Sequence, residues 1–517
     1  AAWGLLVTGR LVATSSEHGL GAALTRLIAR GGEPLIRKGM DAAMRLLGEQ
    51  FVTGRTIEEA LARGKEREKR GYRYSFDMLG EAAMTDEDAR AYLGSYEAAV
   101  HAIGSDGGQR GVIGSNGISV KLSALHPRYV WSQRERVMAE LLPRLKGLCL
   151  LAKGYDIGLN IDAEEANRLD LSLDLLEALV LDPELEGWDG IGFVVQAYQK
   201  RAPFVLDLII DLARRSGHRI MVRLVKGAYW DSEIKRAQVD GLEGYPVFTR
   251  KVYTDVSYLV CAKKLLGARE VIYPQFATHN AHSLAAVYQL AGRDCRPGEY
   301  EFQCLHGMGE TLYDQVVGKE NLDRLVRIYA PVGSHQTLLA YLVRRLLENG
   351  ANSSFVNRIV DERIAVEELI SDPVPLADAL RGAPHPRIPL PRHIYGPARL
   401  NSHGFDLSSE PVRRQLAEAI AASHGRAYTA VPMVPGATVA GLALPVVNPA
   451  DRDEIVGSVI EADEMTTDAA LAIAQAALQD WSTLPAMERA GCLTRAAALM
   501  EVRALERRQV EVVEEPV

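Results

Sequence analysis

The 517-residue sequence has few cysteines, no C-x-x-C pair and no long apolar run. Its five cysteines are odd in number and scattered, a pattern typical of reduced thiols in a cytosolic protein. They are Cys149, Cys261, Cys295, Cys304 and Cys492. A membrane-spanning helix needs about 18 or more apolar residues in a row, and residues 1–14 lack the basic start and apolar core of a signal peptide. These absences predict a cytoplasmic protein without a transmembrane segment.

An excess of positive charge is also missing, because 67 acidic residues outnumber 59 basic ones and the formal net charge is −8. We therefore expect no nucleic-acid partner. The glycine-rich stretch 104–117 has no G-K-[ST] ending and follows no strand, so we expect a mobile loop and not a phosphate-binding loop. His279 and His282 lie three residues apart, but no cysteine or carboxylate pair completes a zinc set, so no metal site is expected.

Short apolar runs alternate with helical patterns from Ile118 onward. The runs are residues 118–122, 157–162, 191–196, 219–226, 271–279, 300–306, 325–330 and 353–358, and the clearest helical stretches are 164–181, 202–215, 247–266 and 336–348. Eight strands alternating with helices predict an α/β fold, a parallel (β/α)8 (TIM-like) barrel over residues 118–372. A doubly wound open sheet is the alternative, but the glycine fingerprint that usually follows its first strand is missing.

The segments before and after the predicted barrel differ from it in residue pattern and composition. Residues 1–117 are predicted to form a helical arm and α-domain ending in the glycine-rich loop, since residues 17–103 show mostly helical spacing. Residues 373–446 contain two stretches rich in proline and small residues and are predicted to be a linker. The last segment, 447–517, begins with a short motif and an alanine-rich stretch that ends at Trp481, which by itself predicts an ordinary amphipathic helix.

The predicted strands end in polar side chains, which is where (β/α)8 enzymes keep their active sites. These residues are Lys121, Asp162, Gln196, Arg223, Lys226, Thr278, His279, Gln303, His306 and Tyr329. The richest stretch is 223–236, R-L-V-K-G-A-Y-W-D-S-E-I-K-R, where two cations and two aromatic residues follow one strand. Any single member could be a satisfied core group or a helix cap, as Asn280 is placed to be. Together they predict an active site.

The predicted helix 336–348 adds two adjacent arginines. Tyr341, Arg344, Arg345 and Glu348 fall on one face, and Leu338, Leu339, Leu342, Val343, Leu346 and Leu347 on the other. Such a polar face is more often solvated. Beside Lys121, however, two adjacent guanidinium groups could form a planar fork for a carboxylate.

Three classes of function remain open on these residues alone. Several cations around one barrel mouth suit an anionic cofactor together with an anionic substrate. Lys226 could instead be a Schiff-base lysine, as in barrel aldolases, because an apolar wall lowers the pKa of a lysine. A non-catalytic scaffold is the third class.

A resemblance to a known family favours the first class. The motifs are I-S-V-K-L-S-A-L-H-P, N-I-D-A-E-E-A, G-F-V-V-Q-A-Y-Q-K-R, R-L-V-K-G-A-Y-W-D-S-E-I-K-R-A-Q, P-Q-F-A-T-H-N-A-H, F-Q-C-L-H-G-M-G-E, R-I-Y-A-P-V-G and Y-L-V-R-R-L-L-E-N-G-A-N. In order, and nearly unbroken from about residue 70 to residue 360, they resemble the proline dehydrogenase domain of the bifunctional proline utilization A flavoenzymes. N-P-A-D-R-D-E-I-V-G-S-V in the last segment resembles the opening of an aldehyde dehydrogenase domain.

The resemblance implies an activity, a cofactor and partners. The activity is oxidation of L-proline to Δ1-pyrroline-5-carboxylate, the first step of proline catabolism to glutamate, with non-covalent FAD. Electrons pass to a quinone, so transient peripheral contact at the inner face of the membrane is expected, and other small cyclic carboxylates are expected ligands. The catalytic cysteine and NAD segments of an aldehyde dehydrogenase are not found, nor is a DNA-binding module recognised. A shortened chain with only the first activity is therefore expected.

The resemblance also implies roles for individual residues. Lys121, Asp162 and Arg223 would be catalytic, with Arg223 beside the flavin. The substrate would be bound by Lys121, Asp162, Tyr229, Leu305, Tyr329, Tyr341, Arg344 and Arg345. FAD would be contacted by Ala163, Gln196, Arg223, Val225, Lys226, Gly227, Ala228, Trp230, Thr278, His279, Asn280, Gln303, Cys304, Arg345 and Glu348. Glu81 and Arg344 would pair as a gate over the bound substrate.

Overall fold

The structure is a computed structural model that describes residues 51–107, 110–292, 294–334, 341–345, 363–397, 399–423, 428–436 and 440–503. The chain divides into two compact units. The first comprises residues 1–235 and 245–388, and the second comprises residues 236–244 and 389–517.

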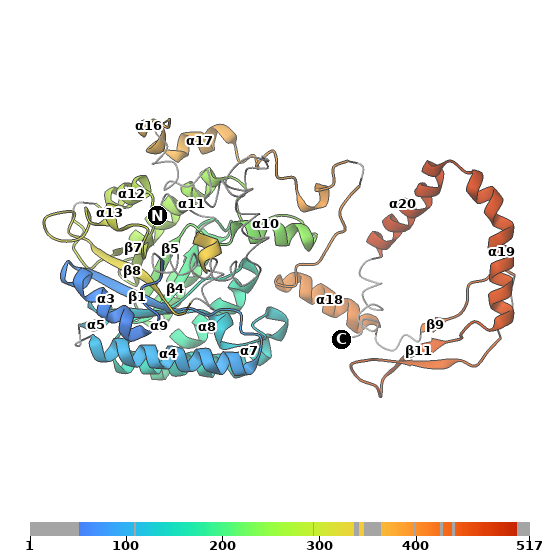
Figure 1. Cartoon of the computed structure of the whole chain (residues 1–517), viewed down its shortest axis with the longest axis horizontal. Helices are drawn as coiled ribbons and strands as arrows, with labels where there is room; N and C mark the ends of the chain where they lie inside the picture. Colours follow the sequence, from blue (N-terminus) through green and yellow to red (C-terminus); the bar gives the residue numbers. More distant parts are fainter. Residues whose placement is uncertain are drawn as a thin grey trace, which may run out of the picture. The chain divides into compact units, whose positions relative to one another are not determined.

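The first unit contains a closed barrel of eight parallel strands (Figure 1). The strands are β1 Tyr72–Met78, β2 Gly117–Val120, β3 Leu159–Ile161, β4 Ile191–Gln196, β5 Ile220–Val225, β6 Ile272–Ala277, β7 Glu301–Leu305 and β8 Leu325–Val332. Each strand pairs with the next, and β1 pairs with β8 from Tyr72 opposite Val326 to Met78 opposite Val332. The predicted (β/α)8 barrel is confirmed.

The first strand corrects the sequence analysis. Tyr72–Met78 lies in a stretch predicted to be mostly helical, yet it is β1, so the barrel starts at Tyr72 and not at residue 118. The predicted eighth strand, 353–358, lies outside the described residues, and β1 fills the place in the barrel that was assigned to it. The reason is that β1 has polar residues at every second position, so it does not form the apolar run that marked the other strands.

Helices surround the strands. They are α3 Ile57–Lys69, α4 Asp86–Asp106, α6 Leu122–Leu125, α7 Arg134–Gly154, α8 Leu169–Val180, α9 Ala202–Ser216, α10 Trp230–Val239, α11 Lys251–Leu266, α12 Ala281–Ala291, α13 Glu310–Tyr313, α16 Val366–Leu369 and α17 Pro373–Leu380. Three of the predicted helices are found as α8, α9 and α11. The predicted glycine-rich loop is partly helical, because α4 runs to Asp106 and α5 is a single turn, Gly111–Gly114.

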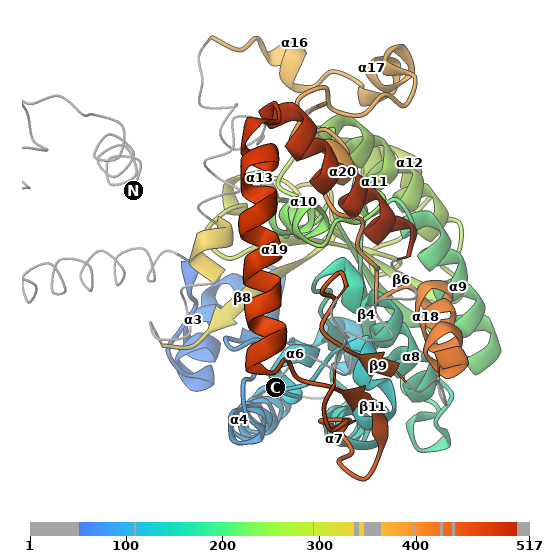
Figure 2. The ribbon, with the colours of Figure 1, turned by 90° about the vertical axis from the view of Figure 1, so that its right-hand side faces the viewer.

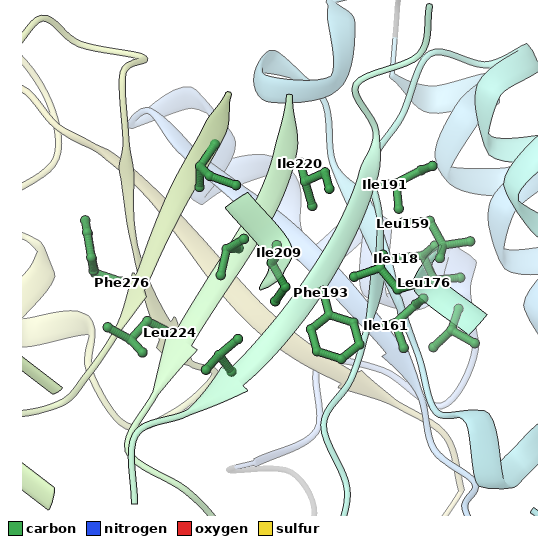
Figure 3. Close-up of a cluster of buried hydrophobic side chains, with 14 of the residues drawn as sticks. Ile118, Leu159, Ile161, Leu176, Ile191, Phe193, Ile209, Ile220, Leu224 and Phe276 are labelled. Carbon is green, nitrogen blue, oxygen red and sulfur yellow. The ribbon is translucent and has the colours of Figure 1, made fainter. Parts of the chain in front are cut away.

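The apolar core lies between the strands and the helices. Figure 3 shows strand residues such as Ile118, Phe193 and Leu224 with Leu176 of α8 and Ile209 of α9, and all five are buried. The alternate strand residues point into the barrel, where they hydrogen-bond to one another: Ser75 to Ser119, and Asn160 to Gln275. The period of two along each strand thus separates an apolar outer layer from a polar interior.

The second unit contains α18 Glu410–Ser423, a small sheet and two long helices (Figure 2). The sheet has the order β10-β11-β9, with β9 Tyr428–Ala430, β10 Leu444–Val447 and β11 Ile455–Val459. Then follow α19 Glu464–Thr483, which ends two residues after Trp481, the predicted end of that helix, and α20 Ala486–Val502. The predicted linker 373–446 therefore contains regular elements. None of the helices within the described ranges combines the length and apolarity that crossing a bilayer needs.

Candidate active site

A buried cluster of charges lies where β1, β2, β3 and β8 end. Lys121, directly after β2, donates from Nζ to Asp77 Oδ1 at 2.6 Å, to Asp162 Oδ2 at 3.4 Å and to the Tyr329 hydroxyl at 3.1 Å. Tyr329 in turn donates to Asp162 Oδ2 at 2.6 Å. Asp77 is fully buried, and only 5% of Lys121 and 9% of Asp162 are exposed. One lysine thus bridges two buried carboxylates.

Arg223 of β5 joins this cluster from the opposite wall of the barrel. Its Nη1 donates to Asp162 Oδ1 at 2.7 Å and its Nε to Gln303 Oε1 at 2.6 Å. Its Nη2 donates to the hydroxyl groups of Ser75 and Ser119 at 3.1 and 3.0 Å. Because each of its three nitrogens donates a hydrogen bond, the guanidinium group is held in one orientation. Asp162 therefore lies between two cations.

Burial and the neighbouring charges set the protonation states. Burial raises the pKa of Asp77, and Lys121 acts against this. For Lys121 burial favours the neutral form, but Asp77, Tyr329 and Asp162 outweigh it and raise its pKa well above the ordinary value. Burial, together with Asp162, raises the pKa of Tyr329. The cluster therefore keeps a cationic lysine and a protonated tyrosine at neutral pH.

Glu81 and Arg344 form a second ion pair. Both guanidinium Nη atoms of Arg344 donate to the Glu81 carboxylate, at 2.7 and 2.8 Å, and the Tyr229 ring centroid is 5.2 Å from Arg344 Cζ. Burial alone would raise the pKa of Glu81, but Arg344 lowers it overall. The pairing anticipated for the gate is therefore present.

The helical segment 341–345 turns its polar face inward. Tyr341 and Arg345 are buried, with 6% of Arg345 exposed and its Cζ 5.3 Å from the Tyr341 ring centroid. Leu342 is buried as well, as its place on the apolar face predicted. In contrast, 44% of Val343 is exposed, so the prediction that Val343 belongs to the core is wrong. Because the arginine is desolvated, this face differs from a solvated one. Glu348 lies outside the described residues.

The residues around β5 and α10 could hold a large cofactor. Gly227 adopts φ +137°, and a Cβ there would lie 2.4 Å from the Tyr198 ring, so only glycine fits. Lys226 pairs with Asp255 and lies 5.6 Å from the Tyr258 ring centroid; burial lowers its pKa and Asp255 opposes this. The Trp230 indole donates to the Phe248 carbonyl at 2.8 Å.

The remaining predicted cofactor residues occupy the ends of β4, β6 and β7. Gln196 donates to the Glu164 carbonyl at 2.9 Å, and the two residues line a pocket together with Asp162 and Ala163. His279 Nε2 accepts from the Leu305 N–H at 3.0 Å, which fixes its proton on Nδ1 in the neutral ring. Thr278 and Asn280 accept backbone N–H groups of the turn that starts α12.

Some predicted residues do not reach the cluster. Cys304 belongs to the buried core outside the barrel, because Gln303 and Leu305 take the inward positions of β7. The backbone of Val225 and Ala228 flanks the Gly227 turn. Asp77 was not among the predicted site residues, because the stretch that forms β1 was predicted to be helical. The alternation Ser75, Phe76, Asp77 is the signal that could have revealed it.

The donor set fits an anionic, ring-bearing cofactor such as FAD. Amide, hydroxyl and cationic side chains and a glycine turn with no room for a Cβ come together at one mouth. No group of three or more metal-ligating side chains occurs among the residues that the structure describes. The absence of a metal site from the whole chain therefore stays a prediction.

The fold and this mouth define a (β/α)8 barrel with its polar centre at the carboxyl ends of the strands, as in barrel enzymes. Residues 60–358, more than half of the chain, match the family model described as proline dehydrogenase. The chain belongs to the proline dehydrogenase family. Residues 438–515 match the aldehyde dehydrogenase family.

The N-terminal residues 1–51 match a model described as the DNA-binding domain of proline dehydrogenase. This match contradicts the expectation that the chain lacks such a module. Almost all of these residues lie outside the described ranges, so the absence of a nucleic-acid partner remains an untested prediction.

Relatives and solved structures agree with the family. The bifunctional protein PutA of Klebsiella aerogenes is 61% identical over 97% of this chain and 39% of its own length. Proline dehydrogenase 1 of Bacillus subtilis (strain 168) is 28% identical over 60% of this chain and 90% of its own. A crystal structure of a mutant of Bradyrhizobium japonicum proline utilization A is 47% identical with a TM-score of 0.76, over 93% of this chain and 45% of its own. The chain thus spans less than half of this curated PutA protein and of this solved one.

Proposed function

We propose that this chain oxidises L-proline to Δ1-pyrroline-5-carboxylate with non-covalently bound FAD and delivers the electrons to a quinone. The observation that carries the proposal is the buried pairing of Lys121 and Arg223 with Asp162 at the barrel mouth of a proline dehydrogenase family member. A cytoplasmic location with peripheral membrane contact, and the binding of other small cyclic carboxylates, are part of the same proposal. Whether the chain lacks the aldehyde dehydrogenase activity stays a prediction.

The cations supply a clamp for the proline carboxylate. Lys121, Arg344 and Arg345 come from β2 and from the helical segment 341–345, and all three are largely removed from water. A desolvated cation attracts a carboxylate more strongly than an exposed one. Tyr229, Tyr329 and Tyr341 lie against these cations and would cover the apolar ring of the substrate.

The cofactor would be held by Gln196, Lys226, Thr278 and the backbone at Gly227. The chemistry that FAD supplies when bound is acceptance of a hydride from the ring carbon next to the proline nitrogen. The protein needs no strong base for this step, only a fixed geometry of the two reactants. Arg223 adds a positive charge whose position is set by four hydrogen bonds and which favours an electron-rich, reduced ring system.

The main competitor is a Schiff-base aldolase that uses Lys226. Burial lowers the pKa of this lysine, as such a mechanism requires, but Asp255 holds the ammonium group in an ion pair. Formation of an imine would therefore have to break that pair.

The visible spectrum of the purified protein separates the two reactions. We expect a yellow protein that L-proline bleaches under anaerobic conditions without added NAD. An aldolase would be colourless and would be trapped covalently by borohydride and its substrate. A stoichiometric flavin that proline fails to bleach would contradict the substrate, and a colourless protein would contradict the cofactor.

Arg223→Met tests the positive charge at the end of β5. The variant loses the contacts to Asp162, Gln303, Ser75 and Ser119 but keeps an apolar stem of similar length. We expect weaker flavin retention, or turnover at least about tenfold lower, with a smaller effect on proline binding. Arg214→Met, which removes an exposed arginine of α9, is the control. An unchanged spectrum and turnover number in Arg223→Met would remove Arg223 from the site.

A further inference from the structure

The two residues that follow Glu81 are both hydrogen-bonded to one residue outside their loop. We define the gate loop as residues 79–84, between β1 and the Thr85 cap of α4. The two residues that follow Glu81 both donate to Ser123: the Ala82 N–H to Ser123 Oγ at 2.9 Å, and the Ala83 N–H to the Ser123 carbonyl at 2.8 Å. Ser123 thus receives both N–H groups next to the gate acid.

Ser123 is oriented by a buried carboxylate. Its N–H donates to Glu164 Oε2 at 3.0 Å, and its hydroxyl donates to Glu164 Oε1. Arg168 Nη1 also donates to Oε1, at 3.1 Å; burial raises the pKa of Glu164, and Arg168 acts against this. Because Oε2 accepts the Ser123 N–H and Oε1 accepts from Arg168, the Ser123 hydroxyl directs its hydrogen to Glu164 and its lone pairs to Ala82.

The backbone beside Glu81 is strained. Ala82 has φ +52°, in the left-handed region that costs a residue with a Cβ about 1 kcal/mol or more. Such a conformation persists only where the surroundings impose it. The two hydrogen bonds to Ser123 do so here. Without them Ala82 is expected to relax, and Glu81 would move relative to Arg344.

We infer that Ser123 and Glu164 are a positioning pair that holds the gate loop with Glu81 opposite Arg344 and thereby slows escape of a bound carboxylate. The inference rests on the proposed function for its ligand. Ser123 and Glu164 lie two residues after Lys121 and Asp162, so the loops that carry the charge cluster also anchor the gate loop. They affect binding through Glu81 and do not contact the ion pair themselves.

Two variants loosen the pair by different routes. Ser123→Ala removes the acceptor of the Ala82 N–H and leaves the carbonyl that serves Ala83. Glu164→Gln keeps the shape but replaces one acceptor by an NH2 group. If the NH2 group takes the place of Oε2 it faces the Ser123 N–H, and if it takes the place of Oε1 it faces Arg168. Two donors cannot bond to each other, so one hydrogen bond is lost in either orientation. Ser257→Ala removes a buried hydroxyl of α11 and is the matched control.

Hydrogen exchange of the gate-loop amides is the first measurement. We expect the Ala82 amide to exchange about three- to tenfold faster in both variants, which corresponds to loss of one hydrogen bond. The second measurement is the dissociation rate of tetrahydrofuran-2-carboxylate from the flavin-loaded protein. It should rise by about the same factor in both variants, while in Ser123→Ala the rate of flavin reduction at saturating proline stays within about twofold. This split between binding and chemistry is not expected from a general loss of stability.

Exchange and dissociation rates equal to those of the wild type in both variants, or a parallel fall in the flavin-reduction rate, would overturn the inference. Thermal unfolding of each variant shows whether it is folded, and Glu164→Gln carries the test if Ser123→Ala is not. If the wild-type protein neither binds this acid nor reduces its flavin with proline, the proposed function fails. The exchange measurement then still decides whether the pair holds the loop.

Discussion

Arg345→Met is expected to lower kcat/KM for L-proline by at least about 30-fold. Only 6% of Arg345 is exposed, and removing one partner of a buried, charge-assisted contact costs about 2 to 5 kcal/mol. Arg345→Lys should lose much of the same energy, because a point charge does not reproduce the planar fork. Steady-state kinetics, with flavin occupancy checked by absorbance, measure both effects.

The substrate gives an independent form of the same test. Pyrrolidine lacks the carboxylate and should be a very poor substrate, whereas tetrahydrofuran-2-carboxylate should compete with proline. Arg90→Met removes an exposed arginine of α4 that pairs with Asp86, and it should change kcat/KM by less than about twofold. Values near wild type for both Arg345 variants at full flavin loading would mean that the carboxylate clamp lies elsewhere.

Lys121→Met is expected to have a still larger effect, a loss of about 100-fold or more in kcat/KM. The variant leaves Asp77 and Asp162 facing the mouth without the cation between them. An anionic substrate would then meet the unpaired Asp77 and a clamp reduced to Arg344 and Arg345, while Asp162 keeps only Arg223. Breaking a buried ion pair also costs about 3 kcal/mol of stability, because a charge remains without its partner.

The stability loss in Lys121→Met should depend on pH with a definite sign. Burial already raises the pKa of Asp77, and loss of Lys121 raises it further. A carboxyl group whose pKa is higher in the folded state than its unfolded value near 3.8 destabilises the fold fully above the folded pKa, and the penalty shrinks as pH falls from the folded pKa to the unfolded one. The deficit in unfolding free energy relative to wild type should therefore grow as pH rises from the folded pKa of Asp77 in the wild type to its higher folded pKa in the variant, and should level off above it.

A second substitution separates stability from activity. Adding Asp77→Asn to Lys121→Met removes the unpaired charge, so much of the stability at pH 8 should return while kcat/KM stays low. Lys264→Met, which breaks an exposed pair with Asp207, is the control for loss of a lysine. A deficit that neither varies with pH nor recovers in the double variant would contradict the charge assignment.

Much of the site was predictable because the active sites of (β/α)8 barrels lie at the carboxyl ends of the strands. Lys121, Asp162, Arg223, Gln303 and Tyr329 were chosen because each ends or follows a predicted strand, and the structure joins all five in one hydrogen-bonded network. Parallel strands bring their carboxyl ends to the same edge, so the order of strands sufficed for this. The roles assigned to these residues remain proposals.

The partners of these residues were not predictable in the same way. Asp255 pairs with Lys226 from the N-terminal part of α11, and nothing in its local sequence distinguishes it from a solvated acid. Glu164 and Ser123 meet only because two loops converge. Asp77 was lost with β1, whose inward positions Ser75 and Asp77 are polar, so that the strand resembles a polar segment and not a buried one.

The pairing of β1 with β8 sets the order in which this molecule can be completed. The contact from Tyr72 opposite Val326 to Met78 opposite Val332 joins residues about half the chain apart. During synthesis β1 emerges first and must keep an unpaired edge until β8 follows, and contacts of such high contact order form slowly. Glu81 and Arg344 lie just outside this seam, so we expect their ion pair to form only once it closes. The proposed gate would then be completed late in folding.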